Sequence, residues 1–147
     1  MARAQKRIGK ELSRFDGDAG ESGLTLEAVS ETEWKVSFVM GAETVFSGEN
    51  YSLRIVFTNE YPMESPIVVF EQPSPMHEHV YSNGHICLNI LDDDWSPALT
   101  VCSVCLSIQS MLASAQAKLR PPDDKQYSAR NVSNPKMTSW FFHDDSV

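Results

Sequence analysis

The sequence has no apolar run long enough to cross a bilayer, and its first residues include no apolar segment of signal-peptide length. It has only three cysteines, and two of them lie three residues apart on a helical pattern. An odd number of cysteines in this arrangement is not the disulfide framework of a secreted domain. We therefore expect a soluble protein with free thiols, located in the cytoplasm, the nucleus or both, and no membrane partner.

Basic residues are almost absent from the body of the chain, where Lys35 and Arg54 are the only two between residues 15 and 117. The first fourteen residues instead carry five basic side chains and one acidic one, although the whole chain has a net charge of -8. General nucleic-acid binding needs a broad positive surface, so we expect no nucleic-acid partner. A basic first helix suits an acidic protein partner, but it is equally typical of a solvated helix face.

The length of 147 residues and the hydrophobic content of 41% suit one domain that covers residues 1–147. Ile8, Leu12 and Phe15 have helical spacing, which predicts a first helix that ends in residues 16–20. Apolar and polar residues then alternate as in half-buried strands. The expected strands are at residues 24–26, 34–40, 51–57 and 67–70. Their short connections predict an antiparallel meander.

Helical spacing returns from Val101 to Ala115, and Thr100 is placed to cap the start of this long helix. Two prolines at 121 and 122 end the pattern, and the segment from about residue 119 to residue 147 is a variable, irregular tail. Residues 140–142 are its aromatic part, and nothing in the sequence places them. The order of helix, meander, irregular segment and helix predicts an α+β fold.

The strongest functional signal is the segment from residue 77 to residue 88, HEHVYSNGHICL. In it Cys87 lies between two apolar residues, follows the turn-forming Asn83-Gly84 pair and is close to three of the four histidines. A thiolate can take an acyl group from another thioester and hold it until an amine attacks, without a metal or organic cofactor. Cys87 is therefore the candidate nucleophile, which requires a reachable sulfur atom. A buried, inert cysteine is the alternative.

A histidine ten residues before a GxICL cysteine, followed by WSPALT at residues 95–100, resembles the core signature of ubiquitin-conjugating enzymes. The run HVYSNGHICL and the aromatic tail before residues 143–145 resemble the W-type members, which modify the N-terminal α-amine of substrates. The resemblance implies the ubiquitin-conjugating fold and a ubiquitin thioester on Cys87. It also implies four kinds of partner: ubiquitin, the ubiquitin-activating enzyme, RING or U-box ligases, and substrates with flexible N-termini. The chain itself is expected to be a monomer or a weak dimer.

Most of this family has His-Pro-Asn where this chain has His77-Glu78-His79. The family's asparagine is credited with steadying an oxyanion. One neutral imidazole nitrogen of His79 could donate to an oxyanion or accept a proton from the amine, but not both. Glu78 would raise the pKa of His79 only if their side chains approach, although neighbours on a strand point to opposite faces. His77 is expected to order the loop through hydrogen bonds.

The altered motif fits chemistry on an α-amine. Its reference pKa of about 7.7 to 8.0, against about 10.4 for lysine, leaves it deprotonated far more often at neutral pH. An enzyme that acts on α-amines therefore needs less help with deprotonation. This preference is a hypothesis about the acceptor.

The resemblance also implies two docking surfaces. The first helix would bind the activating enzyme, through Arg3, Lys6, Arg7 and Lys10. Two loops would bind the ligase, through Pro62, Met63, Trp95, Ser96, Pro97 and Ala98. Met63 replaces the usual aromatic residue, and its unbranched side chain can still fill a shallow apolar groove. Trp95 and Pro97 equally suit core and turn roles.

The sequence also contains features typical of other chemistry. Three histidines and Cys87 are zinc-ligand types within eleven residues, although we expect no metal. Cys102 and Cys105 resemble a redox pair, but their helical position predicts a core Cys105 and a partly exposed Cys102. A cysteine hydrolase would need an oriented histidine and an oxyanion hole. A non-catalytic binding variant of the ubiquitin pathway is the other alternative, and such relatives usually lose the cysteine.

Overall fold

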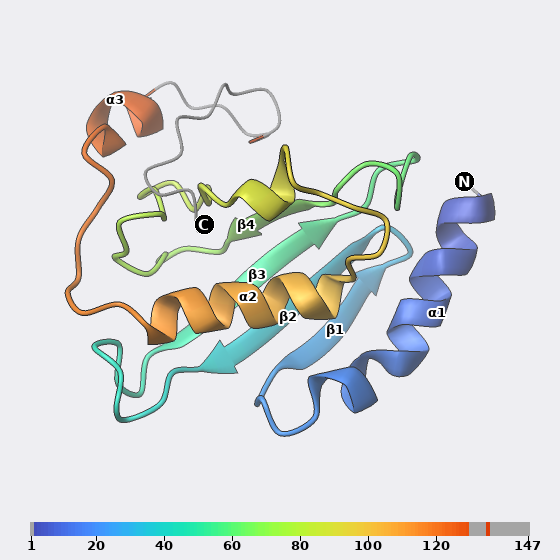
Figure 1. Cartoon of the computed structure of the whole chain (residues 1–147), viewed down its shortest axis with the longest axis horizontal. Helices are drawn as coiled ribbons and strands as arrows, with labels where there is room; N and C mark the ends of the chain where they lie inside the picture. Colours follow the sequence, from blue (N-terminus) through green and yellow to red (C-terminus); the bar gives the residue numbers. More distant parts are fainter. Residues whose placement is uncertain (1, 130–134, 136–147) are drawn as a thin grey trace.

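The computed structural model describes residues 2–129 and 135, and Figure 1 shows its arrangement. Its elements are α1 (Ala2–Ala19), β1 (Thr25–Ser30), β2 (Glu33–Val39), β3 (Asn50–Val56), β4 (Ile67–Phe70), the 3-10 helix η1 (Asn89–Leu91), α2 (Val101–Ala113) and α3 (Asp124–Ala129). The aromatic residues 140–142 lie outside the described residues. Within the described part of the chain, no helix combines the length and the apolar character that a membrane span needs.

The four strands form one antiparallel sheet in the order β1-β2-β3-β4, which confirms the predicted meander. In the central strand β2, Trp34, Val36 and Phe38 are buried, and the residues between them are partly exposed. Val36 pairs with Leu26 on one side and with Leu53 on the other, so the register continues this apolar face across the sheet. The alternation in the sequence therefore predicted which face of the sheet is covered.

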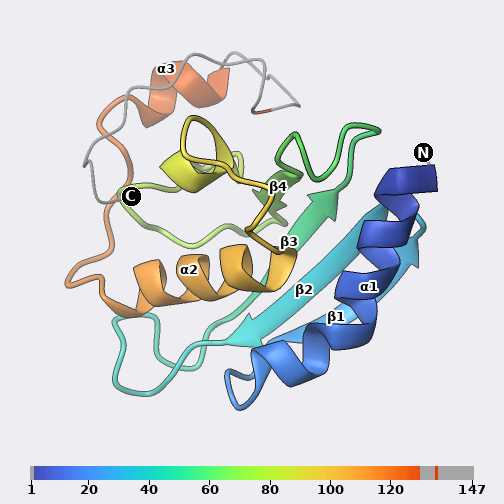
Figure 2. The same cartoon turned by 45° about the vertical axis from the view of Figure 1, so that its right-hand side comes forward.

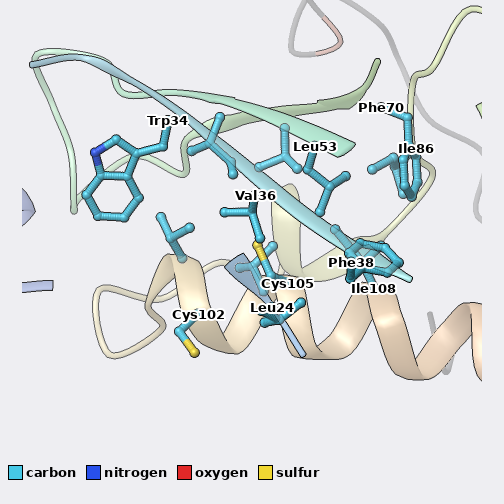
Figure 3. Packing of buried hydrophobic residues seen from close by; sticks show 14 of the residues in the cluster. Leu24, Trp34, Val36, Phe38, Leu53, Phe70, Ile86, Cys102, Cys105 and Ile108 are labelled. Atoms are coloured by element: carbon cyan, nitrogen blue, oxygen red, sulfur yellow. The ribbon is translucent and has the colours of Figure 1, made fainter. Parts of the chain in front are cut away.

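Helix α2 covers that face and contributes the other half of the core (Figures 1 and 3). Its start has the expected cap, because the Thr100 hydroxyl accepts from the Ser103 amide and the Ser103 side chain accepts from the Thr100 amide. Cys105 points toward Val36 of the sheet (Figure 3). Cys102 lies on the other side of α2 and is buried, so the expected partial exposure is wrong. Burial raises the pKa of its thiol, and the charges of Asp18 and Glu11 of α1 add to this.

Helix α1 lies beside β1 and the start of α2 (Figure 2) and ends at Ala19, within the predicted residues 16–20. The residue that it buries in its middle turn is Glu11, whereas Leu12 is 42% exposed, contrary to the predicted apolar face. The buried positions of α1 are Ala4, Ile8, Glu11, Phe15 and Ala19. A carboxylate is tolerated there because it accepts hydrogen bonds from the Tyr61 hydroxyl and from the backbone amide of Val101.

Candidate active site

The segment that holds Cys87 is fixed to the edge strand β4 at Gly84. The Gly84 carbonyl accepts from the Phe70 amide at 2.9 Å, and Val69 forms a bridge with His85. Gly84 has a φ of +94°, and a Cβ atom added there would lie 2.3 Å from the Phe70 carbonyl oxygen. Both the dihedral angle and the close approach require glycine. The Asn83-Gly84 turn therefore positions the nucleophile segment on the sheet.

The chain then folds back on itself and brings Cys87 beside the histidine motif. The Cys87 amide donates to the His79 carbonyl at 2.8 Å, and the Tyr81 amide donates to the His85 carbonyl at 2.9 Å. Because these are backbone bonds, they fix the position of Cys87 relative to His79 whatever the side chains do. Two residues that the sequence singled out are thus neighbours in space.

His77 is buried and holds the turn that precedes His79. Its Nδ1 atom accepts a hydrogen bond from the His79 amide at 3.0 Å, and its ring stacks with Phe46 at a centroid distance of 6.5 Å. Burial, with an added contribution from the neighbouring His79, lowers the pKa of His77 to about 4. The ring is therefore neutral at physiological pH, as an acceptor at Nδ1 must be.

His79 is also buried, and its Nε2 atom lies 3.8 Å from a carboxylate oxygen of Glu78. The approach of these neighbours differs from the strand expectation because residues 77–80 form a turn, closed by a hydrogen bond from the Val80 amide to the His77 carbonyl. Glu78 itself is mostly exposed. The exposed carboxylate of Glu78 therefore lies beside the buried ring of His79.

The sulfur atom is not reachable in this conformation, because Cys87 has a relative exposure of 0%. This contradicts the expectation that the nucleophile is accessible. Cys87 forms a small buried cluster with Tyr81 and with Tyr127 of α3. The rings of the two tyrosines stack at a centroid distance of 3.9 Å. Helix α3, in a segment that the sequence predicted to be irregular, therefore covers the candidate nucleophile.

Polar contacts join α3 to this site. The Tyr127 hydroxyl shares a hydrogen bond of 2.6 Å with Nδ1 of the buried His85. The Tyr81 hydroxyl donates to the Asp123 carboxylate at 3.0 Å. Burial raises the pKa of Tyr81, and the bond to Asp123 raises it further, so this phenol remains a donor. Sequence reasoning missed Tyr127 and Asp123, since a lone tyrosine in a polar stretch is the only signal that they leave.

The structure places three of the four proposed activating-enzyme contacts, Arg3, Lys6 and Lys10, on the exposed side of α1. Arg7 is engaged within the chain instead. Its guanidinium donates to the carbonyls of Pro97 and Leu99 at 2.8 and 2.9 Å, and its Nε atom pairs with Glu11 at 2.8 Å. Arg7 therefore supports the loop before α2.

The two loops proposed for ligase binding lie together. The Trp95 indole donates from Nε1 to the Pro62 carbonyl at 2.8 Å and packs near the Tyr61 ring. Trp95 is thus partly a core residue. Met63 is 72% exposed beside this contact. The exposed residues Pro97 and Ala98 and the partly buried Ser96 complete the surface.

The histidines near Cys87 do not assemble as metal ligands would. In the described part of the chain, no three side chains among His, Cys, Asp and Glu are grouped in a way that could hold a metal ion. The rings of His77 and His79 lie 5.4 Å apart, but Nδ1 of His77 is occupied by a backbone amide. The histidines that have the spacing of metal ligands in the sequence form hydrogen bonds within the fold instead, as His77 and His85 do.

Comparison with known proteins connects this geometry to one family. The model of the family described as ubiquitin-conjugating enzyme matches residues 7–139. The chain is 49% identical to the probable ubiquitin-conjugating enzyme E2 W-A of Danio rerio, over 99% of each chain. It is 46% identical to the ubiquitin-conjugating enzyme E2 W of Caenorhabditis elegans, over 98% of this chain and 97% of that one.

Solved structures agree with this result. The ubiquitin-conjugating enzyme E2 UbcA1 of Agrocybe aegerita superposes with a TM-score of 0.85 at 39% identity, over 90% of this chain and 98% of that one. A ubiquitin-conjugating enzyme E2 of Plasmodium falciparum gives a TM-score of 0.71 at 41% identity, over 76% of this chain and 99% of that one. The expected α+β fold is confirmed.

Proposed function

The chain belongs to the ubiquitin-conjugating enzyme family, and from this premise we propose that Cys87 accepts ubiquitin from the activating enzyme as a thioester and passes it to a substrate amine. Membership makes the chain a ubiquitin-transfer enzyme, which sets aside the cysteine hydrolase. In the transfer, the Cys87 thiolate displaces the activating enzyme's thiol from the ubiquitin carboxyl carbon. An amine then attacks that carbon and releases Cys87.

The observation that carries the proposal is the backbone bond from the Cys87 amide to the His79 carbonyl. It fixes the sulfur-bearing residue beside the one motif in which this chain departs from His-Pro-Asn. The other two cysteines lie in the main core with Val101, Val104 and Ile108. Cys87 lies outside that core and instead packs against Tyr81 of its own segment and Tyr127 of the short helix α3.

The test is incubation with activating enzyme, ATP and ubiquitin, read by non-reducing electrophoresis. The expected product is one ubiquitin adduct that thiols cleave. It should disappear in Cys87→Ser and persist in Cys102→Ala, the matched control for loss of a buried thiol. A thiol-cleavable adduct that survives in Cys87→Ser, or no adduct in the native chain, would contradict the proposal. The second outcome would favour the non-catalytic binding variant.

We propose further that the acceptor is the N-terminal α-amine of a flexible substrate. Two features support this: His79 occupies the position of the family's asparagine, and an α-amine has a lower pKa than lysine. Full-length relatives at 46 to 49% identity carry the E2 W name. The thioester is mixed with one of two peptides that differ at a single position and at the N-terminus. One has a free N-terminus and an arginine at that position, so its only reactive amine is the α-amine. The other is acetylated and has a lysine there, so its only amine is the lysine side chain. Faster discharge to the lysine peptide would refute the preference.

The proposed partners follow from the same membership. Enzymes of this family work with ubiquitin, an activating enzyme and ligases in general, and the surfaces proposed here are the exposed basic face of α1 and the loops around Met63 and Pro97. The basic face contrasts with the acidic body, which suits an acidic partner surface. The ligase surface is tested by the Met63 substitution argued below.

A further inference from the structure

Among the described residues, the short helix α3 contributes to the cover over Cys87. Of the six residues of α3, Tyr127 is the one that is buried, and it shares a cluster with Cys87 and Tyr81. Figures 1 and 2 both show α3 on the opposite side of residues 77–92 from α2. A sulfur atom with no exposed surface cannot be approached by the carbonyl carbon of another thioester. The proposed loading step and this conformation are therefore incompatible.

The contacts that hold α3 in place all reach a short part of the segment before Cys87. The Ser82 amide donates to the Asp124 carboxylate at 2.7 Å, and the Ser82 hydroxyl donates to the Ser128 hydroxyl at 3.0 Å. Tyr81 also bonds to Asp123, and His85 bonds to Tyr127. The bonds from Ser82 and Tyr81 are only partly buried, so water can replace them at low cost, whereas the bond between His85 and Tyr127 is buried. Such partly buried contacts suit a reversible attachment.

The chain just before α3 is anchored much more firmly. The Arg120 guanidinium donates to the backbone carbonyls of Ser74, Pro75 and Val80, at 2.7 to 3.2 Å. Pro121 beside it is buried. A charged group with three carbonyl partners resists detachment more than single hydroxyl contacts do. The boundary between the fixed and the detachable part therefore falls between Arg120 and Asp123.

We propose that α3 is a cover over Cys87 that detaches as a unit, with Arg120 as its fixed base, before ubiquitin can reach the sulfur atom. This inference rests on the proposed thioester function of Cys87. It adds an opening step to the loading reaction. Local opening of a segment with a single buried side chain costs far less than global unfolding, so the step is compatible with a stable fold.

A disulfide between residues 82 and 128 tests the cover directly. The Ser82 and Ser128 hydroxyl oxygens are 3.0 Å apart, so thiols at both positions are within reach of a disulfide. The chain with Ser82→Cys and Ser128→Cys is oxidised, and peptide mapping establishes the crosslink. Iodoacetamide is then added, and alkylation of Cys87 is followed by mass spectrometry. The reduced chain and the single variant Ser128→Cys are the controls.

Locking α3 should slow alkylation of Cys87 by about tenfold or more relative to the reduced chain, and should block ubiquitin loading to a similar extent. Reduction with a phosphine, removed before loading, should restore both rates. Tyr127→Ala should act in the opposite direction and speed alkylation by about fivefold or more over the native chain. Equal alkylation and loading in the locked and reduced chains would overturn the cover.

Alkylation needs no ubiquitin, so the two proposals can fail separately. If locking slows alkylation but no form of the chain is loaded, the cover stands and the thioester function fails. If the native chain is loaded but locking changes neither rate, the thioester function stands and the cover fails. If the engineered pair does not oxidise, the Tyr127→Ala comparison decides, and an unchanged alkylation rate there refutes the cover.

Discussion

The carboxylate of Glu11 on α1 accepts a hydrogen bond from the backbone amide of Val101, the first residue of α2, at 2.8 Å. The same carboxylate accepts from the Tyr61 hydroxyl and pairs with Arg7, which in turn holds the carbonyl of Pro97. One buried side chain thus joins α1, α2 and the two loops proposed for ligase binding. The first backbone amides of a helix have no intrahelical acceptor, so Glu11 supplies the acceptor that the Val101 amide needs.

Replacing Glu11 with alanine should lower the free energy of unfolding by about 3 kcal/mol, because it leaves a buried amide and a buried hydroxyl without their acceptor. Urea unfolding measures the loss. Glu27→Ala is the matched control, since Glu27 is exposed on β1 and its removal should cost less than about 0.5 kcal/mol. Similar losses in the two variants would contradict the role assigned to Glu11.

Glu11 also shows where sequence patterns were sufficient and where they were not. Alternation predicted β2 and its buried residues, because a strand in a half-covered sheet has to bury every second side chain. On α1 the same logic selected Leu12, but the helix turns Glu11 toward the core. A buried carboxylate is stable only with partners, and besides Arg7, four residues away, the partners Tyr61 and Val101 lie 50 and 90 residues away in the chain. No local pattern could identify them.

The candidate site divides in the same way. Cys87 and the two histidines of its motif were found from the sequence, because turn chemistry and residue type mark them locally. The cover was not found, since Tyr127 lies in a polar stretch with no helical periodicity. Its burial depends on stacking with Tyr81 and on the bond with His85. Such contacts between distant segments become visible only when the chain is folded.

The turn at Gly84 gives a second prediction. Gly84→Ala should lower the free energy of unfolding by about 3 kcal/mol, because alanine meets both an unfavourable φ and the Phe70 carbonyl oxygen. Gly20→Ala is the control, as Gly20 also has a positive φ, +56°, but open space around it. Its cost should be about 1 kcal/mol, from the dihedral angle alone. Equal costs in chemical denaturation would show that the contact with Phe70 is unimportant.

His77 predicts a dependence of stability on pH. Burial lowers its pKa from 6.5 to about 4, so between these values the unfolded chain binds a proton that the folded chain does not. The free energy of unfolding should therefore fall as the pH is lowered through this window. The contribution of His77 between about pH 7 and about pH 5 is about 2 kcal/mol.

The difference between the native chain and His77→Asn, measured by urea unfolding at both pH values, isolates this contribution. The carboxylates titrate in both proteins, so their effects cancel in the comparison. The native chain should lose more stability than the variant as the pH falls. If both lose the same amount, His77 does not remain neutral in the folded state.

Met63 tests the proposed ligase surface. It is 72% exposed, so Met63→Asp should fold normally and be loaded with ubiquitin at the native rate. An aspartate in an apolar groove of a RING or U-box domain would be desolvated without a partner, which predicts a loss of about tenfold in ligase-stimulated discharge. Met76→Asp, at another methionine that is 46% exposed, is the matched control and should keep full stimulation. Because both variants add the same charge, a loss in both would indicate a general electrostatic effect, and a loss in neither would remove Met63 from the interface.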